Sequence, residues 1–165
     1  MNNEHLQNLA EIESEFVKED KGEGSLAVYA VRDPAASFSK FAPREESFSV
    51  GYDIDPQDIE ALYFEGIKLP RWESIRAENN DNDQKLRIYN ESFQKVTADF
   101  PLISRVSDTD VRVAFTPEEV LRLHAECERV ADGTADAKAV RAVQKFYIAC
   151  NQAAAGRMGL LLIPG

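Results

Sequence analysis

The sequence predicts an α+β protein. We expect a small mixed or antiparallel sheet with helices packed mainly on one face, and a C-terminal helical hairpin followed by a final buried strand. Polar and apolar residues alternate over 47–54 and 110–115, and a period of two indicates strands with one buried face. Elsewhere apolar residues recur every three or four positions, which indicates amphipathic helices.

The first part of the chain alternates between helix and strand. Residues 4–20 are predicted to be a helix because apolar side chains recur on one face with glutamates between them. Residues 25–32, rich in Val, Ala and Tyr, are predicted to be a strand that pairs with 47–54. A short helix is expected over 56–65.

The middle of the chain has weaker patterns. Residues 66–83 are expected to be mostly irregular, apart from a helical turn around Trp72. Residues 84–99 return to helical spacing through Leu86, Tyr89, Phe93 and Val96. The alternating segment 110–115 follows as a strand.

The C-terminal part gives the clearest signals. Helices are predicted over 117–131 and 136–155, with Gly156 placed to end the second one. Residues 160–163 are apolar at every position, so we expect a central strand covered on both faces.

Composition limits the class of protein. A chain of 165 residues suits one globular domain spanning 1–165. It has no apolar run long enough for a transmembrane helix, no recognisable secretory signal and only two cysteines, so a cytoplasmic location is expected. The net charge of −10 makes nucleic acid and anionic membranes unlikely partners, because both attract clusters of Lys and Arg.

The charge is unevenly distributed along the chain. Residues 1–25 carry seven acids and two lysines, residues 44–60 carry six acids and one arginine, and residues 137–165 carry no acid. This pattern serves solubility or forms an acidic face that steers a basic protein partner. The second alternative gives a candidate binding set of acids with two interface anchors: Glu45, Glu46, Asp53, Asp58, Glu60, Arg71 and Trp72.

The stretch Asp53-Ile54-Asp55 after a predicted strand resembles the opening motif of haloacid-dehalogenase phosphatases, which implies an attacking and a proton-transferring aspartate. The resemblance covers only these residues, and Gln57 stands where that motif has Thr or Val. The pair also matches the short Asp-x-Asp motif of nucleotide-sugar transferases. A helix start explains more, because Asp55 precedes Pro56 and Asp58 follows in the first turn.

Other candidate chemistry is weak. Residues 79–85 resemble the start of a calcium loop, but Lys85 occupies a ligand position. His124 and Cys127 lie on the apolar stripe of a helix and are expected to be packing groups. A hairpin turning near Gly133 would place Cys127 about 15 Å from Cys150, too far for a disulfide. We therefore expect no catalytic, metal or cofactor site.

Two classes of function fit these observations. The first is a small acidic binding protein, most concretely a bacterial immunity or antitoxin-type inhibitor of a basic toxin such as a nuclease, which needs no catalytic residues. The second is a metal-assisted phosphoryl or sugar-phosphate enzyme that uses Asp53 and Asp55. An adaptor or assembly subunit is a further alternative, and the sequence leaves the oligomeric state open.

Overall fold

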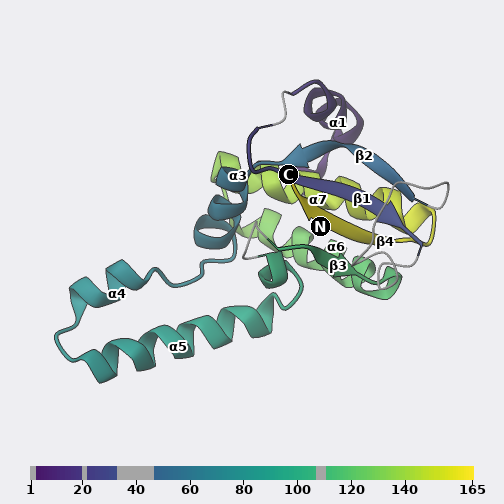
Figure 1. Ribbon diagram of the computed structural model, residues 1–165. Coiled ribbons are helices and arrows are strands. Elements are labelled where there is room, and N and C mark those ends of the chain that lie inside the picture. Colours follow the sequence, from purple (N-terminus) through teal and green to yellow (C-terminus); the bar gives the residue numbers. More distant parts are fainter. Residues whose placement is uncertain (1–2, 20–21, 33–46, 107–110) are drawn as a thin grey trace.

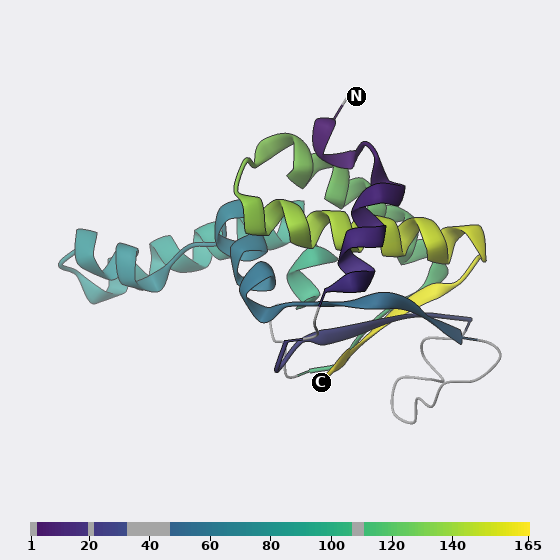
Figure 2. The ribbon, with the colours of Figure 1, turned by 90° about the horizontal axis from the view of Figure 1, so that it is seen from above.

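The computed structural model describes residues 3–19, 22–32, 47–106 and 111–165, and they form the α+β architecture that the sequence predicts. A four-stranded antiparallel sheet forms one layer, and helices cover one of its faces (Figure 2). Two further helices extend away from these layers (Figure 1). Glu45 and Glu46 of the candidate binding set lie outside the described residues.

The strands follow the order β2-β1-β4-β3. β1 (Leu26–Val31) pairs antiparallel with β2 (Ser47–Ile54), as predicted from their alternating patterns. β4 (Gly159–Pro164) lies between β1 and the short β3 (Val113–Phe115). The last of these strands in sequence is therefore an inner strand of the sheet.

Burial along β4 confirms that it is covered on both faces. Leu160 and Leu161 are successive residues of a strand, so their side chains point to opposite faces of the sheet. Both are fully buried. The unbroken apolar run at the end of the sequence reflects this two-sided burial.

The N-terminal helix is shorter than predicted. A 3-10 turn covers Glu4–Leu6, and α1 covers only Leu9–Lys18. Between them Asn8 adopts a left-handed conformation with φ of 56°, which interrupts the regular helix. Asparagine tolerates the left-handed region better than most residues do, which allows the break at this position. The spacing of the apolar residues carries no sign of it.

The C-terminal helical hairpin is formed by α6 (Pro117–Gly133) and α7 (Ala137–Ala155), close to the predicted limits. Thr116 and Glu119 form a reciprocal capping box at the start of α6. Gly156 stands at the C-terminal cap of α7, as expected.

The two cysteines are both free and fully buried in this hairpin, as their packing on the apolar faces predicts. The predicted pairing of the helices, however, is wrong. His124 of α6 stacks on Tyr147 and bonds to Asn151 of α7, so Cys127 lies level with a part of α7 much nearer Cys150 than expected. The hairpin turns later than Gly133, because Asp136 caps α7 and α6 runs through Gly133.

The segment between β2 and α6 also differs from the prediction. α3 (Pro56–Ala61) continues into a π-helical turn, Leu62–Gly66. Residues expected to be irregular then form α4 (Trp72–Glu78), which is followed by α5 (Asn82–Asp99). We call residues 72–99 the arm. None of the helices in the described part of the chain is long and apolar enough to span a membrane.

Candidate functional site

The described members of the candidate binding set fall in two places. Asp53 and Asp58 lie beside α7, near a group of buried charges. Glu60, Arg71 and Trp72 line a groove at the base of the arm. Five members of the candidate binding set are therefore described, two beside α7 and three at the groove.

Asp55 caps a helix, as the sequence predicts. Its carboxylate accepts a hydrogen bond of 2.7 Å from the backbone N–H of Gln57 in the first turn of α3. Pro56 occupies the first helical position, where no N–H donor is needed. The extended backbone of Asp55 and its bond to Gln57 therefore give this residue a structural role at the start of α3.

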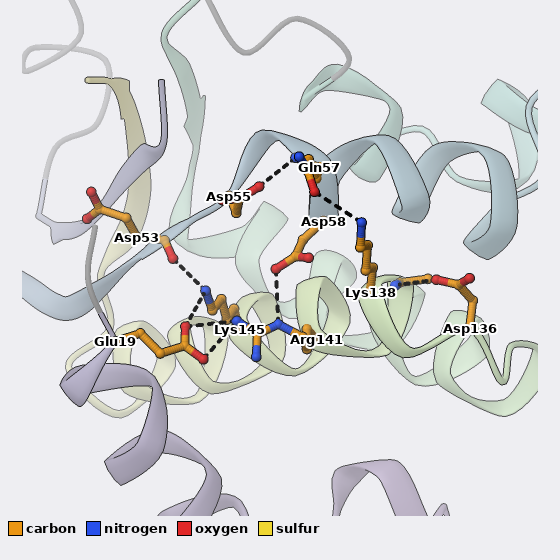
Figure 3. A network of polar contacts seen from close by, with 10 residues as sticks. Glu19, Asp53, Asp55, Gln57, Asp58, Asp136, Lys138, Arg141 and Lys145 are labelled. Atoms are coloured by element: carbon orange, nitrogen blue, oxygen red, sulfur yellow. Dashed lines mark hydrogen bonds and ion pairs between the residues drawn. The ribbon is translucent and has the colours of Figure 1, made fainter. Parts of the chain in front are cut away.

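Lys145 is a buried lysine in the middle of α7, with only 2% of its surface exposed. Its Nζ donates to the backbone carbonyl of Asp53 over 2.7 Å and lies 3.4 Å from the carboxylate of Glu19 (Figure 3). It also lies over the ring of Phe16. A buried ammonium needs such partners, because an unpaired charge is costly in the interior.

Arg141, one turn before Lys145, completes this group of charges. It donates to the carboxylate of Glu19 over 2.8 Å and to that of Asp58 over 3.2 Å (Figure 3). Partial burial lowers the pKa of Arg141, but the bonds to Glu19 and Asp58 outweigh this effect and raise it overall. We call Glu19, Asp58, Arg141 and Lys145 the charge cluster.

The charge cluster explains part of the uneven charge along the sequence. Acids from the two acidic stretches are neutralised by bases from the acid-free C-terminal helix. Asp58 is only 5% exposed and is paired with Arg141, so its charge is not displayed on an open surface. The expectation that Asp58 contributes to an exposed acidic face is therefore corrected by its burial.

A small polar hollow of about 230 Å³ adjoins the charge cluster and is also lined by Asp53 and Asp55. Within the described residues, no group of three or more His, Cys, Asp or Glu side chains is arranged to hold a metal ion. The carboxylate of Asp55 is already used by the helix cap. The hollow accordingly offers three acids, Glu19, Asp53 and Asp55, and two bases, Arg141 and Lys145, which are largely engaged with one another and with the backbone.

The arm is the most unusual feature of the fold. α4 and α5 make their main contact with each other, and neither helix contains a buried residue. Figures 1 and 2 both show the pair extending away from the sheet and the helical layer. Leu86 and Phe93 are 52% and 39% exposed on α5. An amphipathic helix normally buries its apolar stripe, but these two residues of the stripe are left largely uncovered within the described chain.

A groove of about 530 Å³ lies between the base of the arm and the body of the protein. Its aromatic walls come from three elements: Tyr63 and Phe64 of the π-helical turn, Trp72 of α4, and Tyr89 and Phe93 of α5. The three rings of the arm contact one another in turn. Trp72 meets Tyr89 edge-on at 5.7 Å, and Tyr89 stacks on Phe93 at 6.1 Å between centroids.

At each end of the arm, the guanidinium of an arginine lies over an aromatic ring. Before α4, the guanidinium of Arg71 lies 4.0 Å from the centre of the Phe64 ring and pairs with Glu65. After α5, Arg129 of α6 lies 4.6 Å from the centre of the Phe100 ring. Its Nη2 also donates to the backbone carbonyl of Asp99 over 2.6 Å.

Sequence reasoning identified Arg71, Trp72 and Glu60 but missed the other groove residues. Glu73, Tyr63, Phe64, Tyr89 and Phe93 also line the groove. A signal was present along α5, where Leu86, Phe93 and the C-cap residue Phe100 follow one another at intervals of seven positions. Such spacing places side chains on one helical face and is typical of a helix that packs along another helix.

Comparison of the chain with protein-family models, with curated proteins and with solved structures finds no match in any of the three. Its function is therefore inferred from the chemistry of the described residues.

Proposed function

We propose that this protein is an acidic protein-binding module and that the arm is its main contact element. The observation that carries the proposal is the exposed apolar surface of the arm, where Leu86 and Phe93 are open and neither helix contains a buried residue. Helices of this length gain most of their stability from tertiary packing, so a binding partner that covers the stripe would complete the packing. Exposed contiguous apolar surface is also typical of interaction sites.

The partner is a basic protein. The chain carries a net charge of −10, and opposite charge on a partner accelerates association through long-range steering. The most concrete form of this function is an immunity or antitoxin-type inhibitor that neutralises a basic toxin in the cytoplasm by direct binding. Such an inhibitor acts by occupying a surface of the toxin and needs no catalytic group of its own.

The test is binding to a purified basic toxin whose gene lies next to the gene for this chain, as genes for toxins and their inhibitors are expressed together, measured by surface plasmon resonance. The arm variant Leu86→Glu/Phe93→Glu should raise Kd by about 30-fold or more, because truncating a central anchor typically costs about 2 kcal/mol. Leu121→Glu is the matched control, since Leu121 is 62% exposed on α6 and outside the arm. Equal loss in both variants, or no loss in the arm variant, would contradict the proposal.

Ionic strength tests the role of charge separately. Raising salt from about 0.05 to about 0.5 M shortens the Debye length from roughly 14 to roughly 4 Å, so the association rate should fall about tenfold or more. The dissociation rate should change much less, because short-range packing controls it. A salt-independent association rate would leave the negative charge as a solubility feature.

A further inference from the structure

We propose that the groove at the base of the arm receives a lysine or arginine side chain of the partner. This inference rests on the proposed function and specifies its chemistry. The groove is bounded by both the body and the arm, through Ile59 and Tyr63 on one side and Tyr89 and Phe93 on the other. A side chain bound there would contact both parts of the molecule.

The charges at the groove favour a cation. Glu60 and Glu73 both line it and are exposed, and within the described residues neither forms an ion pair. Arg71, the one base among the lining residues, is already paired with Glu65 and stacked on Phe64. Lys138, in the neighbouring hollow, donates to Gln57. Glu60, Glu65 and Glu73 therefore outnumber these two bases, which leaves a local net charge of −1.

The aromatic walls of the groove also favour a lysine or arginine side chain. The electron-rich faces of Trp and Tyr attract Lys and Arg, and the attraction grows when the cation is partly removed from water. The chain itself uses this contact at both ends of the arm, through Arg71 on Phe64 and Arg129 on Phe100. A partner's cation placed between Trp72 and the two free carboxylates would add a third contact of the same kind.

Trp72 allows a direct measurement, because it is the only tryptophan in the chain and lies in the groove. The intact protein is titrated with the capped peptide acetyl-Leu-Arg-Leu-amide and, separately, with the same peptide carrying neutral citrulline in place of arginine. We expect a saturable change in Trp72 fluorescence with the arginine peptide and none with the citrulline peptide at equal concentrations. No saturable change with arginine, or equal saturation by citrulline, would overturn the proposal.

Variants locate the binding site. Glu60→Gln/Glu73→Gln should raise the Kd of the arginine peptide at least tenfold. Glu11→Gln/Glu15→Gln, which removes the same charge from exposed positions on α1, should leave it unchanged. Thermal melts establish that both variants are folded. Equal effects of the two variants would show general attraction to an acidic protein and would overturn the proposal.

The same variants separate this inference from the proposed function. If the partner protein binds the Glu60→Gln/Glu73→Gln variant as tightly as the wild type but fails to bind the arm variant, the function stands and the groove proposal falls. If the arginine peptide binds in the groove but no basic protein binds the arm, the function falls instead. A dimer in analytical ultracentrifugation that the arm variant converts to a monomer would show that a second copy covers the groove, which also overturns the proposal.

Discussion

Arg141 donates to the carboxylate of Asp58 across 3.2 Å and so joins the N-terminal part of α7 to the first turn of α3. Removing the buried acid should destabilise the protein, although Arg141 keeps its bond to Glu19. We expect Asp58→Ala to lower the free energy of unfolding by about 2 kcal/mol, below the 3–5 kcal/mol typical of fully buried pairs. Urea unfolding measures this loss.

A double-mutant cycle with Arg141→Ala isolates the pair itself. The two losses should be less than additive, because each substitution removes the same contact. Strictly additive losses would show that Asp58 acts on α3 alone, for instance through the charge at the start of the helix.

The cap at α3 predicts a different pattern for Asp55. Asp55→Asn should be nearly neutral, because asparagine caps a helix as well as aspartate does, whereas Asp55→Ala should cost about 1 kcal/mol. Thermal melts of both variants test this. The same large loss in both would count against the cap.

Magnesium tests the enzyme hypothesis directly. We expect Mg²⁺ to leave Tm unchanged, because the carboxylate of Asp55 is engaged with the backbone of Gln57. A clear rise in Tm that disappears in Asp53→Asn would support a metal-assisted reaction at these residues.

Glu126 predicts a pH dependence of stability. Its buried carboxylate accepts hydrogen bonds from the backbone N–H groups of Leu102 and Ile103, and burial raises its pKa in spite of those bonds. A carboxyl group with a raised pKa in the folded state contributes stability that is complete below its unfolded pKa and is lost as pH rises through the folded value. The stability of Glu126→Gln relative to the wild type should therefore increase as the pH rises above the unfolded pKa of a glutamate, about 4.3.

Urea unfolding of the Gln variant and the wild type at several pH values measures this difference. Glu126→Ala is the companion variant: it leaves two N–H groups without their acceptor and should cost about 2 kcal/mol or more at every pH. A stability difference between Gln variant and wild type that does not change with pH would contradict the effect assigned to Glu126.

The thiols of Cys127 and Cys150 should react slowly in the native protein. Both are fully buried, and burial raises the pKa of each, so little reactive thiolate forms. A colorimetric thiol assay should count two thiols only after denaturation. Two rapidly reacting thiols in the native protein would show that the hairpin opens easily.

Local patterns were sufficient to predict most of the fold. The alternation of Phe48, Val50, Tyr52 and Ile54 predicted β2 and its partner, and Thr116 with Glu119 predicted the start of α6. These signals depend on residues close together in the sequence. Their physical causes, a half-buried strand and unsatisfied helical N–H groups, act over a few residues.

The arm and the charge cluster could not be predicted in the same way. Glu19 and Lys145 are 126 residues apart, so nothing in either local sequence reveals that the two charges pair. The spacing of Leu86, Tyr89 and Phe93 predicted a helix with an apolar face, but not that the face would extend beyond the body. Composition indicated negative charge, yet only the fold distinguishes Asp58, which is neutralised, from Glu60, which is exposed.

The position of β4 has a consequence for the order of folding during synthesis. In the described sheet, β3 pairs only with β4, and β1 has β4 as its second neighbour. The hairpin of β1 and β2 can form early, but the sheet stays divided until residues 159–164 have left the ribosome. Until then β1 and β3 present open edges, which are prone to pair with other chains. A nascent chain that stalls before Gly159 is therefore expected to need protection from aggregation.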